Sequence, residues 1–320
     1  MSGAGEDRGL VVGVTGASSD LGRLLLPRLA ADPRVSRIVA FDVAAPAPVP
    51  KLEVLKIDLT RPGSEPALIE TFRSFGLDAL YHLAFLSSRV RGASFAHELE
   101  VIGSMHVLAA AGATALPRLI VASTTALYGA RTDAPGILVE EQPLRGPRAS
   151  RFIHDKIEVE RQLESFRQRH PETQVAVLRF APIVGPDVDN PISRWLRTKV
   201  FPLPLGFDPL WQVVHQDDAA TALIQALTST AEGPFNIACD EVLPLSAVVR
   251  QAGGVAVPVP GTVLEGVLEV MSRAGLPTAQ PSLLEYLRHS WVADVARARE
   301  VLGFVPRYTA LAALRTTRGA

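Results

Sequence analysis

Cysteine is almost missing from this chain, since Cys239 is the single cysteine among 320 residues. One thiol cannot form an internal disulfide, and it excludes a zinc site built from several cysteines. We therefore expect no metal centre and a reducing compartment, with Cys239 as a small buried apolar side chain.

The chain also has no surplus of either charge, because its 32 basic and 33 acidic residues give a formal net charge of −1. Without a basic surplus, binding to nucleic acid or to an anionic membrane is not expected. No stretch approaches the ~18 uninterrupted apolar residues of a membrane helix. Residues 1–9 are polar and do not resemble a signal peptide, so we expect a flexible tail. These absences favour a cytoplasmic protein with a small-molecule partner.

What the sequence does contain is an alternation of short apolar runs with helical patterns. The runs that predict strands lie at 10–15, 37–41, 52–57, 79–84, 118–122 and 175–180. The patterns that predict helices lie at 21–31, 65–75, 97–113 and 150–169. Strands that alternate with helices indicate an α/β fold with a Rossmann-like, doubly wound parallel sheet.

The alternation breaks after Pro182 into a proline-rich stretch and resumes only briefly. We therefore expect a Rossmann domain at 10–182, to which residues 212–238 return. Residues 183–211 and 239–320 are expected to form a smaller, C-terminal substrate-binding lobe.

A glycine-containing turn follows the first predicted strand, in the sequence TGASSDLG at 15–22. Gly16 and Gly22 fit the outer positions of a dinucleotide-binding turn, where a helix N-terminus receives a pyrophosphate, and Ser19 occupies the middle glycine position. Asp42 ends the next strand, where a carboxylate accepts hydrogen bonds from an adenosine ribose and repels a 2′-phosphate. The pairing predicts NAD rather than NADP, although Asp20 places a negative charge beside the pyrophosphate path.

With this turn in place, the chain resembles the extended short-chain dehydrogenase/reductases of the NAD-dependent epimerase/dehydratase family. The resemblance runs from about residue 11 to 306. Its further motifs are KIDL at 56–59, HLA at 82–84, VIGS at 101–104, STTALYG at 123–129, RFAPIVGP at 179–186, VHQDDAA at 214–220 and REVLGFVP at 299–306. Glu100 stands where the family's motif before VIGS has an asparagine.

The resemblance implies roles for single residues. Asp58 would meet the adenine, and His82 would end the fourth strand near the cofactor. Thr124 would bind the substrate oxygen, and Lys156 would hold the nicotinamide ribose. In RFIHDK at 151–156, Phe152 stands where the family has its proton-donating tyrosine.

Phenylalanine has no proton to transfer, whereas a tyrosine one helical turn before a lysine can act as a general acid/base. Tyr128 and His154 are the candidate substitutes, although His154 lies about 200° round the helix from Phe152. His82 is more typical of a satisfied core histidine.

The C-terminal residues argue against a sugar nucleotide as the substrate. Trp211 and Leu284 stand where two arginines grip the diphosphate in similar epimerases, and Arg288 is one turn away. The segment 263–274 is an amphipathic pattern that fits either core packing or an apolar substrate wall.

Two functions remain open from the sequence. The first is an NAD-dependent oxidoreductase, an atypical member of this family, that acts on a small, fairly apolar hydroxy or keto compound. The second is an NAD(H)-binding protein without turnover, serving as a sensor or a partner subunit. If Phe152 is an engineered replacement of the tyrosine, the first interpretation follows directly. The helices at 97–113 and 150–169 correspond to those that pair in many similar proteins, so a homodimer is expected.

Overall fold

The computed structural model describes residues 8–84, 92–147, 150–274 and 283–317. Its centre is a seven-stranded sheet in the order β11-β6-β5-β4-β1-β2-β3, in which every neighbouring pair is parallel. The strands are β1 (Leu10–Thr15), β2 (Val35–Asp42), β3 (Leu52–Lys56), β4 (Ala79–His82), β5 (Arg118–Thr124), β6 (Gln174–Phe180) and β11 (Gly233–Ile237). The predicted doubly wound, Rossmann-like sheet is thereby confirmed.

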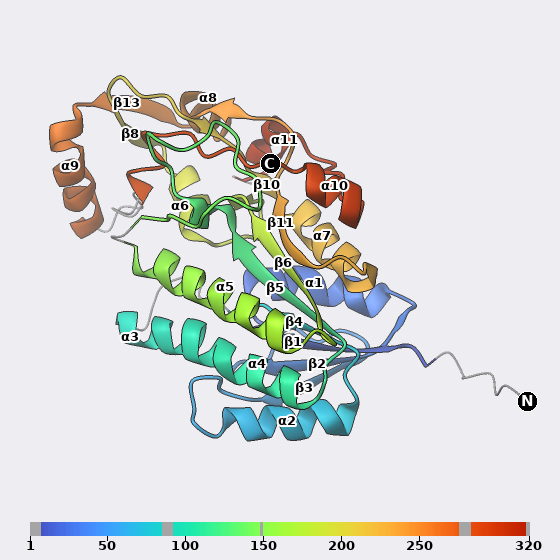
Figure 1. Cartoon of the computed structure of the whole chain (residues 1–320). Coiled ribbons are helices and arrows are strands. Elements are labelled where there is room, and N and C mark those ends of the chain that lie inside the picture. The colour runs from blue at the N-terminus through green and yellow to red at the C-terminus, as the bar shows by residue number, and fades with distance from the viewer. Residues whose placement is uncertain (1–7, 85–91, 148–149, 275–282, 318–320) are drawn as a thin grey trace, which may run out of the picture.

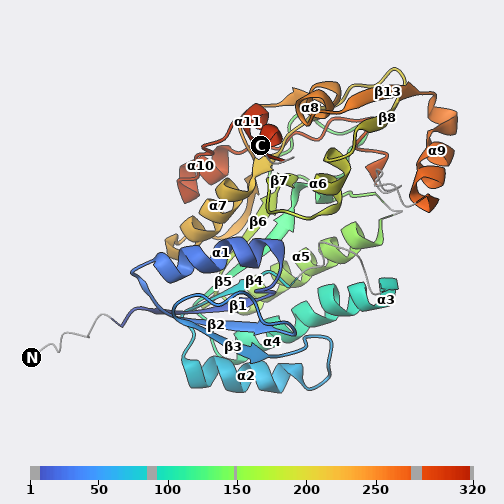
Figure 2. The same cartoon turned by 180° about the vertical axis from the view of Figure 1, so that it is seen from behind.

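Helices cover both faces of this sheet, as a buried parallel sheet requires. The helices α2 (Ser64–Phe75), α4 (Gly103–Ala113) and α5 (Arg151–Arg169) lie on one face, and α1 (Asp20–Ala31) and α7 (Gln216–Thr228) lie on the other (Figures 1 and 2). Each face buries its own apolar cluster, with Leu25 and Leu223 in one and Phe72 and Phe166 in the other. None of the described helices is long and apolar enough to cross a bilayer.

The helix predicted at 97–113 is not uniform. The short helix α3 (Gly92–His97) continues into a π-helical turn, η1 (Glu98–Ile102), which leads directly into α4. A single π turn inside an α-helix shifts the side chains that follow it and is common at functional sites. Hydrophobic periodicity alone did not predict this turn, which carries the buried Glu100.

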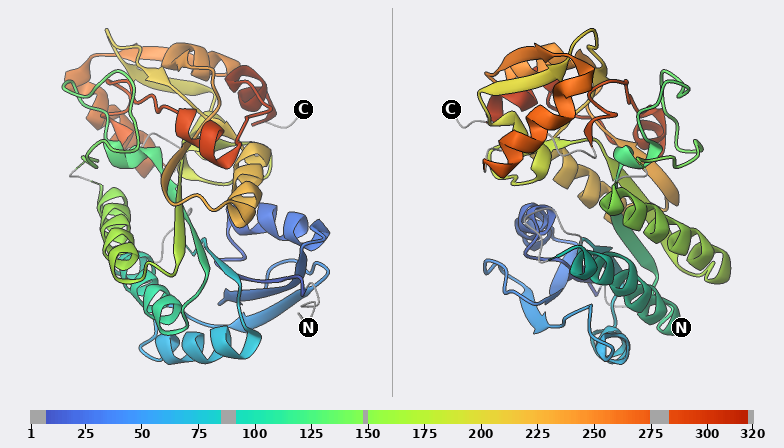
Figure 3. Two further views of the ribbon diagram at one scale, coloured as in Figure 1. Left: turned by 45° about the vertical axis from the view of Figure 1, so that its right-hand side comes forward. Right: turned by 90° about the vertical axis from the view of Figure 1, so that its left-hand side faces the viewer.

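A lobe of short elements lies over the carboxyl ends of β5 and β6 (Figures 1 and 3). It contains three two-stranded sheets, which pair β10 with β7, β12 with β9 and β13 with β8. Its strands are β7 (Ile183–Val184), β8 (Val200–Pro204), β9 (Leu210–Trp211), β10 (Val214–His215), β12 (Leu243–Pro244) and β13 (Val255–Val259). Its helices are α6 (Pro191–Leu196), α8 (Leu245–Gln251), α9 (Gly261–Arg273), α10 (Ala296–Leu302) and α11 (Ala310–Thr316).

Aromatic side chains pack together inside this lobe, and one of them contacts the turn that follows β5. The ring centroids of Trp211 and Trp291 are 5.5 Å apart, and those of Tyr286 and Trp291 are 4.5 Å apart. The Tyr286 hydroxyl donates to the carbonyl of Ala126 at 2.5 Å, in the 3₁₀ turn η2 (Thr125–Tyr128) that follows β5. The contact fixes the lobe against the end of β5, because a buried hydroxyl is costly to leave without a partner.

Candidate active site

A cavity of about 500 Å³ lies between the carboxyl edge of the sheet and the lobe. Most of its wall is apolar, with Leu83, Phe180, Ile192 and Tyr286 among the lining residues. Among the described residues that line it, the charged ones are Asp20, Lys156 and Arg194. A cavity of this size, with an apolar wall and few polar groups, is typical of a small-molecule site.

One end of the cavity is formed by the glycine turn and the start of α1. Gly16 has a φ of +69°, and a Cβ on it would lie 2.5 Å from the Cα of Ala84. A Cβ on Gly22 would lie 2.5 Å from the carbonyl oxygens of Gly16 and Ala17. Both positions therefore require glycine.

Ser19 occupies the middle glycine position of the turn and becomes the N-cap of α1. Its hydroxyl accepts a hydrogen bond from the N–H of Gly22 at 3.1 Å. Ser19, Asp20 and Leu21 line the cavity, so the N-terminus of α1 faces it. Amide groups and a positive helix dipole at this position fit a pyrophosphate.

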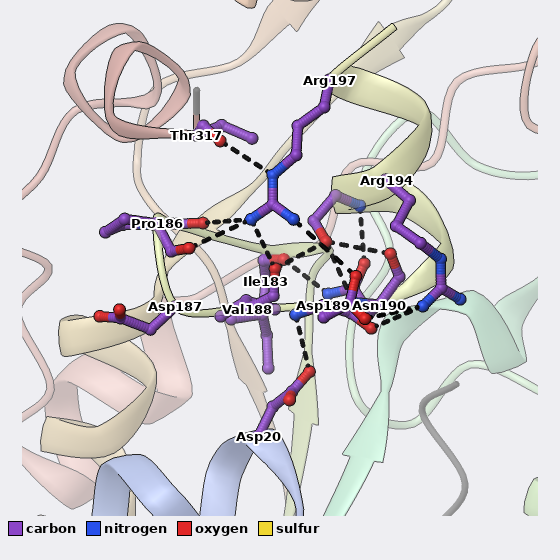
Figure 4. Close-up of polar contacts among 12 residues, drawn as sticks. Asp20, Ile183, Pro186, Asp187, Val188, Asp189, Asn190, Arg194, Arg197 and Thr317 are labelled. Carbon is purple, nitrogen blue, oxygen red and sulfur yellow. Dashed lines mark hydrogen bonds and ion pairs between the residues drawn. The ribbon is translucent and has the colours of Figure 1, made fainter. Parts of the chain in front are cut away.

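The carboxylate of Asp20 is held by protein groups. It forms an ion pair with Arg23. Its Oδ2 also accepts a hydrogen bond from the N–H of Asp189 at 2.9 Å (Figure 4). Asp189 in turn lies 3.2 Å from Nη1 of Arg194 and 3.8 Å from Nη1 of Arg197. Arg23 therefore offsets the negative charge of Asp20, whereas Arg194 and Arg197 offset that of Asp189.

The two aspartates expected at the adenosine end lie on neighbouring strands. Asp42 ends β2, and its carboxylate accepts hydrogen bonds from the N–H of Ser18 at 2.9 Å and of Ala44 at 3.1 Å. Asp58 follows β3 and accepts from both the N–H and the hydroxyl of Thr60. Burial opposes ionisation of Asp58, but these hydrogen bonds and Arg61 lower its pKa overall. Neither aspartate lines the cavity, so both lie outside its apolar part.

His82 is a satisfied core histidine. Its Nδ1 lies 2.7 Å from the hydroxyl of Thr15, and its Nε2 lies 2.9 Å from the hydroxyl of Ser104. Burial and the nearby Lys156 lower the pKa of His82 to about 3, so the ring is neutral. His82 lies behind the residues that line the cavity and is not itself one of them.

The three residues expected at the catalytic position all line the cavity, namely Thr124, Phe152 and Lys156. Thr124 ends β5, and its oxygen accepts from the N–H of Ala126 at 3.2 Å, which leaves the hydroxyl proton for another acceptor. Lys156 is buried on α5, with Nζ 5.9 Å from the ring centroid of Phe152. Phe152 is 44% exposed.

Two residues that the sequence did not assign to the site also belong to it. The Oε2 of Glu100 lies 3.0 Å from Nζ of Lys156, and Arg194 lines the cavity from α6. The signal for Glu100 was its departure from the family's asparagine, whereas no motif marked Arg194.

Neither candidate substitute for the tyrosine, Tyr128 or His154, lines the cavity, so the structure gives no support to either as the proton donor. The Tyr128 hydroxyl donates to Asn236 at 2.8 Å and accepts from Arg179 at 2.7 Å, and burial raises its pKa to about 12. His154 is exposed on α5 and does not line the cavity. Side chains of the sheet and the lobe hold Tyr128, and the helix turns His154 away.

The lobe presents apolar side chains where the family's arginines would stand. Trp211 is fully buried and donates from Nε1 to the carbonyl of Tyr286 at 2.7 Å, and Leu284 is buried too. Helix α9 packs Leu264 and Leu268 into the core of the lobe, and it contributes none of the described lining residues. Of the two interpretations of 263–274, core packing is the one that the structure supports.

Comparison with known sequences places this geometry in a family. The profile of the NAD dependent epimerase/dehydratase family matches residues 12–238. An uncharacterized protein of Mycobacterium tuberculosis is 32% identical over 312 residues, which cover 95% of this chain and 82% of that protein. A UDP-glucose 4-epimerase of Rhizobium leguminosarum bv. trifolii is 24% identical over 66% of each chain.

Solved structures share the fold along the whole chain. MoeE5 in complex with UDP-glucose and NAD has a TM-score of 0.73 and 25% identity, over 97% of each chain. The UDP-glucose 4-epimerase of Thermotoga maritima has a TM-score of 0.74 and 18% identity, again over 97% of each chain. The dTDP-glucose 4,6-dehydratase of Bacillus anthracis, in complex with NAD, has a TM-score of 0.72 and 16% identity, over 97% of this chain and 95% of that one.

The predicted cofactor, NAD, agrees with the family and with these complexes. With the glycine turn, the threonine and the lysine in their expected places, and with a profile match over residues 12–238, the chain belongs to the NAD-dependent epimerase/dehydratase family.

Proposed function

We propose that the protein is an NAD-dependent oxidoreductase that acts on a small, fairly apolar hydroxy or keto compound. The observation that carries the proposal is the cavity itself, where Thr124 and Lys156 face a wall built mainly from apolar and aromatic side chains. Such a wall binds an apolar body, and the two polar groups orient a single oxygen.

The residues that would hold NAD are present. The turn at Gly16 and Gly22 and the N-terminus of α1 would receive the pyrophosphate. Asp42 would accept hydrogen bonds from the adenosine ribose, and Lys156 would donate to the nicotinamide ribose. The bound cofactor supplies the acceptor or donor of a hydride.

The chain's own residues supply positioning. Thr124 has a hydroxyl proton to donate to the substrate oxygen, and the aromatic wall from the lobe excludes water around it. A positioned hydrogen bond to the reacting oxygen stabilises the charge that develops there. Phe152 contributes packing only, because its ring carries no proton.

The proposed substrate differs from that of the named relatives. A sugar nucleotide carries a diphosphate, which arginine forks hold best. Here buried Trp211 and Leu284 stand in those positions, and Arg194 is the one arginine among the described lining residues. An apolar wall with a single arginine favours a small compound over a nucleotide sugar.

A second function is favoured by Phe152 alone. Loss of a positioned acid/base typically slows a reaction by roughly 10²–10⁴-fold. A chain that keeps the NAD site without that group could serve as an NAD(H)-binding sensor or as a partner subunit. This alternative predicts tight NADH binding and no turnover.

The test begins with fluorescence titrations of NADH, NADPH and UDP-glucose. Turnover is then measured with NAD⁺ and NADH over a panel of apolar alcohols and ketones, with wild type and Phe152→Tyr. NADH binding with turnover of a panel compound supports the oxidoreductase. NADH binding without turnover in either form supports the sensor, and binding of UDP-glucose contradicts the proposed substrate class.

A further inference from the structure

Lys156 forms a buried ion pair with Glu100 beside the cavity. The Nζ–Oε2 distance is 3.0 Å, and the exposed fractions of the two side chains are 6% and 1%. Burying two charges is costly, and removing either partner would leave the other as an uncompensated buried charge. The family's asparagine could not supply the negative charge that Glu100 places beside Lys156.

A chain of hydrogen bonds anchors the turn that carries Glu100. The hydroxyl of Ser104 donates to the carbonyl of Glu100 at 2.5 Å, and the Nε2 of His82 lies 2.9 Å from the same hydroxyl. Nδ1 of His82 then reaches the hydroxyl of Thr15 on β1 at 2.7 Å. The π turn is therefore tied to two central strands, which fixes the carboxylate against Lys156.

In the described part of the chain, three elements place charged or titratable groups near Lys156. Glu100 lies on η1, Glu160 lies one turn further along α5, and His82 lies on β4. Glu160 is already paired with Arg179, whose Nη2 lies 2.5 Å from Oε2, and His82 is neutral. Burial lowers the pKa of Lys156 to about 8, although Glu100 opposes this shift. Lys156 can thus exchange a proton near neutral pH.

We propose that Lys156, with Glu100 as its fixed counter-charge, is itself the acid/base of this site and takes the place of the absent tyrosine. The inference rests on the proposed function. When an alcohol is oxidised, its O–H bond breaks and the proton passes to the neutral amine of Lys156. Its C–H bond breaks with transfer of a hydride to NAD⁺, and a carbonyl forms. In the reverse direction the ammonium of Lys156 returns the proton to the oxygen.

This role links the proton on Lys156 to the charge of the cofactor. The nicotinamide ring is positively charged in NAD⁺ and neutral in NADH, so NAD⁺ disfavours an adjacent ammonium and NADH does not. Binding of NAD⁺ should release a proton from Lys156 and leave the neutral base that oxidation needs. Binding of NADH should leave the proton in place.

Calorimetry in buffers with different ionisation enthalpies measures the released proton without any substrate. If NAD⁺ lowers the Lys156 pKa by about one unit, wild type releases about half a proton at pH 7.5, and NADH causes a much smaller release. Glu100→Gln should move the release to lower pH, because the carboxylate that favours the ammonium is gone. Lys156→Met should abolish it, and Lys199→Met, at an exposed lysine, should leave it unchanged.

Wild type alone provides a second measurement, in case the variants fold poorly. The chain has four lysines, Lys51, Lys56, Lys156 and Lys199, so ¹³C-lysine NMR resolves each titration. One lysine should titrate near pH 8 and shift downward with NAD⁺ but not with NADH. Equal proton release for both nucleotides, or unchanged release in Lys156→Met, overturns the proposal while NAD binding stands. Failure to bind either nucleotide overturns the proposed function and this inference with it.

Discussion

Replacing Phe152 with tyrosine should restore the acid/base that the family uses. Phe152 is 44% exposed, so the added hydroxyl is not forced into a packed core, and the free energy of unfolding should change by no more than about 0.5 kcal/mol. Nζ of Lys156 lies 5.9 Å from the ring centroid, close enough for the ammonium to lower the pKa of a phenol there. Relative to a site without a working acid/base, a positioned one is worth roughly 10²–10⁴-fold, so turnover should rise by about 10²-fold or more at a pH where Lys156 is protonated and cannot take the proton. That gain corresponds to about 2.7 kcal/mol of the activation free energy.

The pH profile sharpens this test. Lys156 has a pKa of about 8 without nucleotide, and bound NAD⁺ should lower it, so the neutral amine becomes available to the wild type as the pH rises through about 7. The advantage of Phe152→Tyr in alcohol oxidation should therefore be largest below pH 7 and should shrink toward pH 9.

The assay follows NADH formation by stopped flow with an alcohol from the substrate panel. The control is Phe152→Leu, which removes the ring without adding a hydroxyl. The reasoning is refuted if Phe152→Tyr binds NAD⁺ normally, the wild type turns over the substrate, and the variant shows no gain below pH 7.

Three further predictions concern the cofactor and assembly. NAD(H) should bind more tightly than NADP(H), because Asp42 faces the 2′-phosphate as a like charge. Asp42→Asn should narrow the difference in affinity between the two cofactors. Equal affinities in the wild type would contradict the assignment of Asp42 to the adenosine ribose. Gly16→Ala should weaken NAD binding by more than about tenfold, because the added Cβ would lie 2.5 Å from the Cα of Ala84 and the turn must shift. A normal affinity in titration would show that the turn is only a loop. We expect α4 and α5 to pair with their copies in a homodimer, and sedimentation of a monomer at micromolar concentration would contradict this.

The sequence by itself was sufficient to predict the fold and the cofactor, NAD. Apolar runs and helical periodicity are local properties, and their alternation was sufficient to predict the parallel sheet. The spacing of Gly16, Gly22 and Asp42 predicted a dinucleotide turn, and the two positions accept only glycine because an added Cβ would lie 2.5 Å from neighbouring backbone atoms. Phe152 and Lys156 share a face of α5 because one helical turn separates them.

Only the tertiary structure decided which groups surround Lys156. Glu100 is 56 residues away in the sequence, and its contact with Lys156 depends on a π turn that periodicity does not reveal. Likewise, Asp20 meets the N–H of Asp189 across 169 positions of the chain. Charges and hydrogen bonds act over a few ångströms in space, whatever the separation along the chain, so the chemistry of this site emerges only when the sheet and the lobe are packed together.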